Sequence, residues 1–297
     1  MSGDPLWPSA LPPALSRSEL ALFQALVEAE AGIHLSSAKN ALVANRLARR
    51  LRELGLPSFA AYHAYVTARG NEAEKVRMLD SLCTHETSFF REPRHFDLLR
   101  EHIFPQWAAQ AAQGRRPHDI RVWSAGCSTG EEPYSLAMEL LEAFPRGSGW
   151  NLEVVATDLS TWAVKRAEEG VWSMERARTI PQALLRKYML RGVRSQEGQM
   201  MAGPELRPFM RFARANLHAP ATWPMGAFDI IFCRNVLIYF GAEARARVIQ
   251  GLLSRLPETG YLFLGHAESL IGITAAARSV SANVYTPRPG PPLPSRE

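Results

Sequence analysis

A loop of small residues between an apolar run and a helical run is the part of this sequence best suited to hold a ligand. The apolar run covers residues 122–125, the loop contains Gly126 and Gly130, and Glu131 and Glu132 open the helical run. Glycines in such a turn let a ligand approach the backbone closely. Phosphate sites keep the helix start free of acids, so these glutamates oppose a phosphate and suit a ligand with hydroxyls and a cationic centre. S-adenosylmethionine has a ribose, an ammonium and a sulfonium group, and no phosphate.

Asp158 ends the next apolar run, about one strand–helix–strand unit after the loop. An acid at the tip of a second strand can accept hydrogen bonds from both hydroxyls of a ribose. The alternative is an N-cap for the following helix, which needs the same residue type. Together with the upstream loop, this position favours the ligand role, and the two glutamates argue against the pyrophosphate of NAD.

A third candidate group follows the buried run at residues 228–233. Ligands of open α/β sheets sit beyond the carboxyl ends of the strands, which places Arg234, Asn235 and Tyr239 at the mouth of the site. The alternative is that Asn235 makes loop hydrogen bonds and Tyr239 packs at the surface.

The segment at residues 85–96 places two aromatic residues beside Arg91. We interpret it as a lid that packs on the sheet domain and brings a cation to the ligand. The alternative is an interdomain packing segment with a surface salt bridge. His85, His95 and His102 do not have the pattern of a metal cluster, so no metal is expected.

Residues 17–105 have helical patterning without a strand candidate, which predicts a small helical domain and a linker. Ser16 is a candidate N-cap, with Glu19 in capping-box position. Further helices are expected at residues 38–54, 59–68 and 72–82.

Residues 106–286 instead alternate short apolar strands with helices, which implies a parallel sheet covered on both faces. Between residues 181 and 212 this rhythm is lost, which predicts a small β insertion, either a hairpin or a three-stranded sheet. Strands are expected at residues 120–124, 152–157, 228–233, 261–265 and 279–286, with helices up to Phe144 and at 161–169 and 242–256.

Composition sets broader limits. The 297 residues are 46% hydrophobic and carry a net charge of +5, which permits an acidic partner without requiring nucleic acid. Cys83, Cys127 and Cys233 are far apart, so a disulfide framework or zinc site is not expected and a reducing cytoplasm fits. No apolar run is long enough for a membrane span. The proline-rich residues 1–16 and 287–297 are expected to be disordered tails.

The second expected helix carries a cluster of basic residues on the side away from its apolar stripe: Lys39, Arg46, Arg49 and Arg50. Such a face is commonly only solvated. Nucleic acid is a weaker alternative because no aromatic platform is interleaved with the charges, and an acidic helical protein is a third.

Several of these blocks, taken in order, closely resemble the CheR-type chemotaxis receptor glutamate methyltransferase family. The resemblance covers about residues 17–286. It implies an S-adenosylmethionine-dependent enzyme with a Rossmann-like class I methyltransferase sheet, a small β insertion and an all-helical N-terminal domain. The blocks are residues 87–92, 123–135, 156–158, 216–217, 232–240 and 265–269.

The resemblance also implies roles for individual residues. His85 stands where some relatives have asparagine, yet its imidazole can still donate a hydrogen bond. The basic cluster would approach the acidic helical coiled-coil region of methyl-accepting chemoreceptors, and the β insertion would be the place for a receptor's C-terminal tether. A monomer is expected. The implied cofactor contacts are His85, Thr87, Arg91, Glu132, Asp158, Asn216, Leu217, Arg234 and Asn235.

The implied reaction is in-line transfer of a methyl group from sulfonium to a glutamate γ-carboxylate. An exposed glutamate has a pKa of about 4.3, so the carboxylate is ionised at neutral pH and no general base is required. We expect Arg91 to position it and Tyr239 to offer one hydrogen bond. Two alternatives stay open: a methyltransferase of the same fold acting on a small molecule or RNA, and a non-catalytic module that senses S-adenosylmethionine or its product.

Overall fold

The computed structural model describes residues 14–288, which divide between Cys83 and Thr84 into two compact units. The expected proline-rich tails fall almost entirely outside the described residues. The range predicted for the helical domain and its linker, residues 17–105, extends past this division, and residues 84–105 belong to the second unit. Helical periodicity shows that a segment has an apolar face, but it does not show which core that face joins.

The first unit is all-helical, as expected. Ser16 caps the first helix, and the reciprocal capping box with Glu19 is present. Gly55 ends the second helix in the left-handed conformation, and Ser58 caps the third through Ala61 N. The helices are α1 (Arg17–Ala31), α2 (Asn40–Leu54), α3 (Phe59–Thr67) and α4 (Glu72–Leu82), with a 3₁₀ turn at Ser37–Lys39.

A buried carboxylate ties three of these helices together. Glu74 on α4 is 6% exposed. Arg50 on α2 donates to both of its oxygens, from Nε at 2.9 Å and from Nη2 at 2.6 Å. Tyr62 on α3 donates its hydroxyl to Glu74 Oε1 at 2.9 Å. The two-pronged geometry and the third donor satisfy a charge that burial alone would disfavour.

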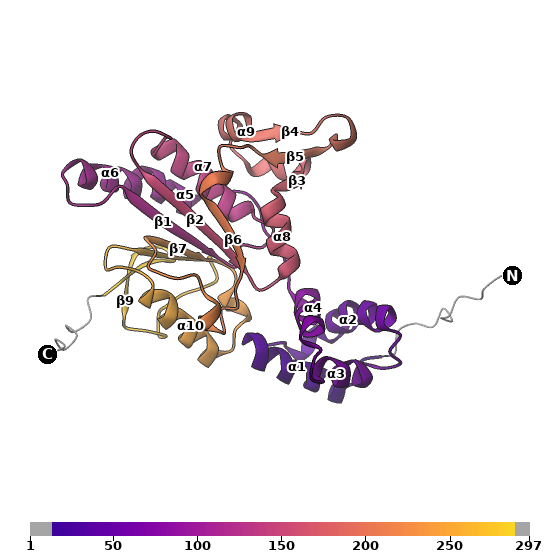
Figure 1. The fold of residues 1–297 in the computed structure, drawn as a ribbon. Helices are drawn as coiled ribbons and strands as arrows, with labels where there is room; N and C mark the ends of the chain where they lie inside the picture. Colours follow the sequence, from indigo (N-terminus) through magenta and orange to yellow (C-terminus); the bar gives the residue numbers. More distant parts are fainter. Residues whose placement is uncertain (1–13, 289–297) are drawn as a thin grey trace. The chain divides into compact units, whose positions relative to one another are not determined.

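The second unit is built on one seven-stranded sheet, with strand order β6-β2-β1-β7-β8-β10-β9 (Figure 1). The first five strands of that order pair in parallel, while β10 is antiparallel to both β8 and β9. The strands are β1 (Asp119–Ala125), β2 (Asn151–Asp158), β6 (Met210–Arg214), β7 (Ile230–Cys233), β8 (Tyr261–Leu264), β9 (Ala277–Ser281) and β10 (Val284–Pro287).

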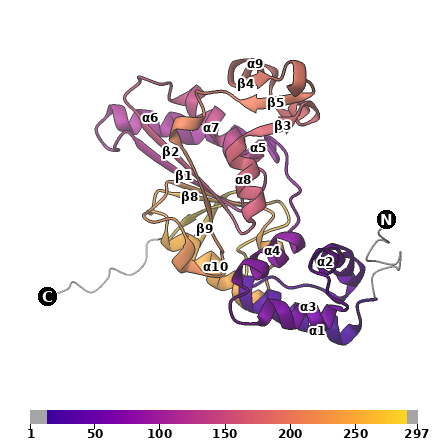
Figure 2. The same cartoon turned by 45° about the vertical axis from the view of Figure 1, so that its right-hand side comes forward.

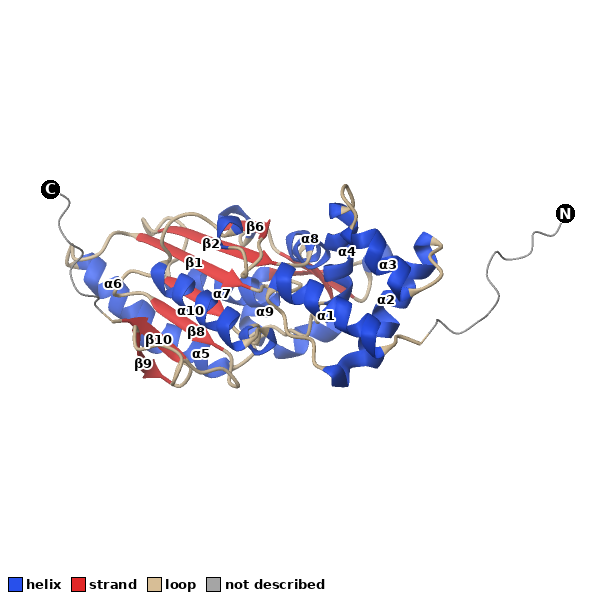
Figure 3. Ribbon diagram, turned by 90° about the horizontal axis from the view of Figure 1, so that it is seen from below, coloured by secondary structure: helices blue, strands red, loops and turns tan. Residues whose placement is uncertain are grey.

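Alternating side chains of the strands enter two separate cores, one on each face of the sheet. Val122 and Phe232 face the core shared with α7, while Trp123 and Ile231 face the core shared with α10. In Figure 1 the strands have α7 on one side and α10 on the other, and Figure 3 shows the same strands from below. The helices are α5 (Pro93–Leu98), α6 (Phe104–Ala112), α7 (Glu131–Ala143), α8 (Thr161–Glu169) and α10 (Ala242–Ser254), and a π-helical turn at Leu99–Ile103 joins α5 to α6.

The β insertion is a three-stranded antiparallel sheet, of order β3-β5-β4, that stands apart from the main sheet beside α9 (Figure 2). It begins earlier than residue 181, because β3 directly follows α8. It also ends before residue 212, because β6 pairs with β2 in the main sheet. Short strands with mixed polarity carry little periodic signal. The elements are β3 (Val171–Ser173), α9 (Gln182–Tyr188), β4 (Met189–Arg191) and β5 (Gln199–Ala202).

The strand expected at residues 279–286 is instead a hairpin, β9 and β10, that turns at Asn283. Asn283 has a φ of 57°, and asparagine adopts this left-handed conformation more readily than most residues.

Among the described residues, no helix is long and apolar enough to cross a membrane.

The Glu74 network generates a prediction for stability. Arg50→Ala should lower the free energy of unfolding of the helical unit by about 3 kcal/mol, because it leaves Glu74 buried without its ionic partner. Native-state hydrogen exchange of α2 and α4 amides in the full chain measures this. Arg49→Ala is the matched control: its side chain is 79% exposed and pairs only with Glu53, so its loss should cost at most about 0.5 kcal/mol. Equal effects of the two variants would contradict the assignment.

Candidate functional site

The three sequence-predicted groups meet at one edge of the main sheet. β1 pairs in parallel with β2 on one side and with β7 on the other, so the carboxyl ends of the three strands lie together. The glycine loop follows β1, Asp158 ends β2, and Arg234 follows β7. This is the edge at which open α/β sheets bind ligands.

The glycine loop turns sharply because two consecutive amides share one acceptor. Gly126 N and Cys127 N both donate to Thr157 O, at 2.7 and 2.8 Å. Gly126 has a φ of 93°, and a Cβ there would lie 2.4 Å from Val236 Cγ2. Glycine is therefore required at Gly126 both by conformation and by the close approach of the loop after β7.

Asp158 holds this loop and the start of α8 at the same time. Its Oδ2 accepts from Ser128 N at 2.8 Å, and its Oδ1 accepts from Ser160 N at 2.9 Å. The N-cap of α8 is Ser160, whose hydroxyl accepts from Ala163 N. Asp158 is thus not the helix cap that the sequence left open as its alternative role.

The two adjacent glutamates at the start of α7 are both buried, and they have different partners. Glu132 accepts from Ser124 Oγ at 2.7 Å and from Arg234 Nε at 2.8 Å. Glu131 accepts from Thr129 Oγ1 at 2.7 Å, and its other oxygen lies 3.6 Å from Arg176 Nη1. Both carboxylates are also favoured by the positive end of the helix dipole.

Arg234 connects the glycine loop region to the segment at residues 85–96. Its side chain is 2% exposed. Besides its bond to Glu132, it donates from Nη1 to Arg91 O at 2.6 Å, and the same nitrogen lies 3.4 Å from Glu92 Oε2. Its guanidinium carbon lies 5.0 Å from the centroid of the Phe232 ring. The side chain is therefore a buried cation that fixes the backbone of Arg91.

His95 supports this arrangement as a neutral base. Its Nδ1 lies 3.2 Å from Arg234 Nη1. Burial, and then the charge of Arg234, lower the pKa of His95 to about 4. The ring is therefore uncharged at neutral pH, and Nδ1 can accept from the guanidinium. His95 therefore has a defined partner in the buried network around Arg234.

The predicted lid packs against its own unit. Phe90 N donates to Ser135 Oγ on α7 at 3.0 Å. Arg176 donates to Thr87 O, and the His85 ring lies 5.2 Å from that of Trp162 at the start of α8. Arg91 points its guanidinium back to Glu86 O at 3.0 Å.

The remaining predicted site residues lie on neighbouring loops of the same edge. Asn216 and Leu217 follow β6, which flanks β2, and Asn216 O accepts from Trp223 Nε1 at 3.0 Å. Leu217 is buried. Tyr239 is half-buried and ends a 3₁₀ turn at Leu237–Tyr239, five residues after Arg234.

Two carboxylates at this edge, Glu92 and Glu268, were missed by the sequence reasoning. Glu92 has a φ of 59° and accepts from His266 N at 3.1 Å. Glu268 accepts from backbone amides of the turn after β7. Their positions inside the matching blocks 87–92 and 265–269 were the signal that could have identified them.

One buried polar atom at this edge could form a hydrogen bond with a ligand that carries hydroxyl groups. Ser128 Oγ, in the glycine loop, is buried and makes no hydrogen bond with any described residue. It belongs to the residue whose amide binds Asp158. A buried hydroxyl without a hydrogen-bond partner is costly, and a ribose beside Asp158 would supply that partner.

In the described part of the chain, no group of three or more histidine, cysteine or acidic residues could hold a metal ion.

The predicted docking residues lie in the helical unit and differ in their contacts. Arg46 donates from Nη1 to Leu82 O at 2.6 Å and to Cys83 O at 3.0 Å. Arg50 is committed to Glu74, as described above. Arg49 is largely exposed, and Lys39 ends the 3₁₀ turn before α2. Arg46 and Arg50 therefore have structural partners within the unit.

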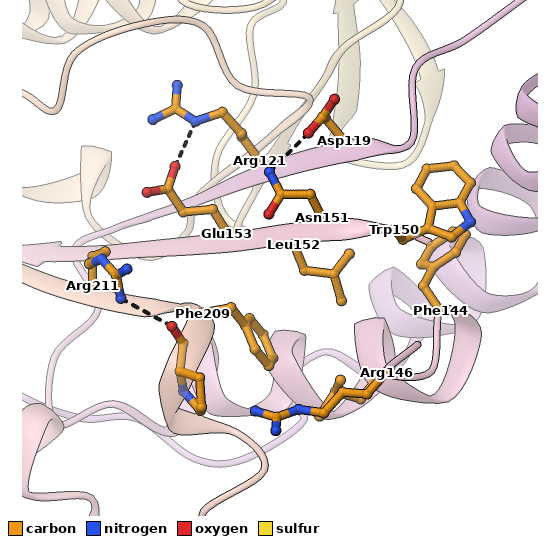
Figure 4. A pocket seen from close by; sticks show the side chains of 12 residues that line it. Asp119, Arg121, Phe144, Arg146, Trp150, Asn151, Leu152, Glu153, Phe209 and Arg211 are labelled. Atoms are coloured by element: carbon orange, nitrogen blue, oxygen red, sulfur yellow. Dashed lines mark hydrogen bonds and ion pairs between the residues drawn. The ribbon is translucent and has the colours of Figure 1, made fainter. Parts of the chain in front are cut away.

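A cavity of about 510 Å³ lies at the opposite edge of the sheet, where β1 and β2 begin (Figure 4). Its charged lining is largely paired: Arg121 Nε donates to Glu153 at 2.6 Å, and Asn151 donates to Asp119 at 2.9 Å. It contains none of the predicted site residues, and it is not the candidate cofactor site.

Comparison with known proteins agrees with this geometry. The family profile of the CheR methyltransferase all-alpha domain matches residues 18–83, and that of the CheR methyltransferase SAM binding domain matches residues 85–286. The chain is 37% identical over 273 residues to a chemotaxis protein methyltransferase of Salmonella typhimurium, covering 92% of this chain and 91% of that protein. It is 38% identical over 257 residues to chemotaxis protein methyltransferase 2 of Pseudomonas aeruginosa, covering 86% and 88%.

Among solved structures, magnesium protoporphyrin IX methyltransferase from Synechocystis with bound SAH covers 68% of each chain at 18% identity, and its TM-score of 0.28 is too low to carry an argument. The family profiles and the relatives confirm the resemblance seen in the sequence. The chain belongs to the CheR family of S-adenosylmethionine-dependent methyltransferases.

Proposed function

We propose that this protein transfers a methyl group from S-adenosylmethionine to glutamate γ-carboxylates of methyl-accepting chemoreceptors. The observation that carries the proposal is the match of both units, over most of the chain, to chemotaxis protein methyltransferases. The site supports it independently, because Glu131, Glu132 and Asp158 surround a glycine loop and suit a cationic ligand with hydroxyls.

In this proposal the glycine loop and Asp158 hold the ribose, while Glu132 lies on the cationic side of the cofactor. The cofactor supplies an electrophilic methyl group on sulfur. His85, Thr87, Arg91, Asn216, Leu217 and Asn235 are the other proposed contacts. Arg234 acts mainly by holding Glu132 and the Arg91 backbone, because its side chain is buried and its donors are directed to those groups.

The substrate carboxylate needs alignment and a dry environment more than it needs activation. It is already ionised at neutral pH, and loss of water strengthens it as a nucleophile. An arginine that gripped it strongly would weaken it again. We therefore assign Arg91 to positioning and Tyr239 to a single hydrogen bond, both near the line from oxygen through methyl carbon to sulfur.

The receptor would be approached by the basic face of α2. Arg49 is the better placed candidate on that face, because its side chain is 79% exposed, whereas Arg46 and Arg50 are half-buried and hold contacts within the helical unit. Lys39, which directly precedes α2, is the second candidate. The β insertion is a second candidate surface. Its order β3-β5-β4 leaves the outer edges of β3 and β4 unpaired within that sheet, and an extended receptor tether could add to such an edge. A monomer acting in the cytoplasm completes the proposal.

Asp158→Ala should weaken binding of S-adenosylhomocysteine by about 100-fold or more, because it removes the ribose acceptor and releases Ser128 N and Ser160 N. Isothermal calorimetry on the full chain measures the affinity. Asp119→Ala, at the opposite edge of the sheet, is the control and should bind normally. If Asp158→Ala binds as tightly as the control, the ribose assignment is wrong.

Tyr239→Phe should lower kcat by about 100-fold on a receptor substrate while leaving S-adenosylhomocysteine affinity unchanged, because it removes one hydrogen bond to the reacting carboxylate. Tyr65→Phe, which changes an exposed tyrosine on α3, serves as the control. Unchanged turnover in Tyr239→Phe would remove Tyr239 from the catalytic set.

The double variant Lys39→Glu with Arg49→Glu should raise KM for receptor roughly 5- to 10-fold, since a charge contact at the protein surface contributes at most about 1 kcal/mol. It should also flatten the dependence of KM on salt. Arg69→Glu makes a charge reversal of the same kind on an exposed turn of the same unit and should have a smaller effect. Wild-type KM in the double variant would refute docking through this face.

A further inference from the structure

Glu268 is a buried carboxylate whose two oxygens are bound by backbone amides. It is 5% exposed. Its Oε2 accepts from Asn235 N at 2.8 Å and from Gly265 N at 2.7 Å. Its Oε1 accepts from Val236 N at 2.9 Å and from Ile238 N at 3.3 Å. Burial raises the pKa of Glu268, and these hydrogen bonds from backbone amides lower it again and so offset part of the cost of burying the charge.

Three of those four amides belong to one turn, residues 235–238, which directly follows Arg234. Asn235 has a φ of 59°, the left-handed conformation, and a change of hand between neighbouring residues turns their N–H groups toward a common point. Such a concave arrangement of amides binds anions. In this protein the bound anion is a side chain of the same chain.

The turn also carries the proposed functional groups. Asn235 is a proposed cofactor contact, and Tyr239 N donates to Val236 O at 3.1 Å, so the turn fixes the backbone of Tyr239. Space around the turn is tight as well: a Cβ on Gly265 would lie 2.5 Å from Asn235 Nδ2. The conformation of the turn therefore decides where both side chains point.

The backbone of Glu268 is also held by a hydrogen bond from another loop. Asn283, at the turn between β9 and β10, donates its side-chain amide to Glu268 O. Through its backbone carbonyl and its carboxylate, Glu268 thus links the β9–β10 hairpin to the turn after β7, two strands away in the sheet order.

We propose that Glu268 is a positioning residue, an internal anion that holds residues 235–239 in the shape that presents Asn235 to the cofactor and Tyr239 to the substrate. The proposal deepens the proposed function and rests on it. Glu268 touches neither reactant in this scheme and acts through the backbone amides that it binds.

The test uses formate as a probe, because formate carries the same carboxylate and can enter the space that Glu268→Ala vacates. In the full chain, Glu268→Ala should lose about 100-fold in kcat, the order expected when a reacting group is displaced by about 1 Å. Added formate should raise the kcat of Glu268→Ala at least tenfold. Glu139→Ala is the control: Glu139 is also buried, but it is bound by the Arg100 side chain at 2.8 Å and not by the amides of residues 235–238. Formate that enters the space vacated there should therefore leave kcat unchanged.

Hydrogen exchange gives a readout that does not depend on methyl transfer. The amides of Asn235, Val236, Ile238 and Gly265 should exchange faster in Glu268→Ala, and formate should slow them again. This result would stand even if the proposed substrate were wrong, so the two proposals can fail separately. Wild-type protection of these amides in Glu268→Ala, or a failure of formate to slow them, would overturn the proposal.

Glu268→Gln covers the case in which the alanine variant does not fold. Glutamine preserves the volume but turns an NH₂ group toward two amide donors, so it should also expose part of the turn and lower kcat. Wild-type kcat and wild-type amide protection in Glu268→Gln would equally overturn the proposal.

Discussion

The buried ion pair between Arg234 and Glu132 is the interaction on which the rest of the site depends. Its nitrogen and oxygen lie 2.8 Å apart, and both side chains are nearly inaccessible to water. Neither charge could remain there alone, because an uncompensated buried charge costs several kcal/mol. The pair joins the end of β7 to the start of α7, and Nη1 of Arg234 donates to the backbone carbonyl of Arg91. Three segments far apart in sequence are thereby held at one edge of the sheet.

The charge around this edge also defines the kind of ligand it can accept. Asp158 holds the glycine loop, Glu131 and Glu132 open α7, and Glu92 and Glu268 hold the turn after β7. The buried cation among them, Arg234, is already shared by several acceptors. A phosphate would meet carboxylates on several sides, whereas a sulfonium and an ammonium would be favoured. The family assignment and the electrostatics therefore agree on the same cofactor.

The sequence predicted the parts of the site that depend on local pattern. A continuous apolar run followed by a polar residue locates a strand end, and this placed Asp158 and Arg234 correctly at one edge. The long-range partners could not be predicted in this way. The sequence pattern of α2 indicates a solvated side chain for Arg50, but in the structure Arg50 pairs with Glu74, which lies 24 residues later in the chain. Likewise, the sequence places Arg234 at the site but does not show that its Nε donates to Glu132 and its Nη1 to the Arg91 carbonyl. The short strands β3 and β6 were misplaced for a related reason, since their mixed polarity has no clear period.

The central claim is that the methyl group reaches a glutamate carboxylate of a chemoreceptor. The most direct measurement is incubation of the purified chain with methyl-labelled S-adenosylmethionine and receptor-rich membranes, followed by treatment with base. We expect label on a receptor-sized band that base releases as methanol, as is typical of a carboxyl methyl ester. Label that is stable to base, or that appears on RNA or a small molecule and not on receptor, would contradict it.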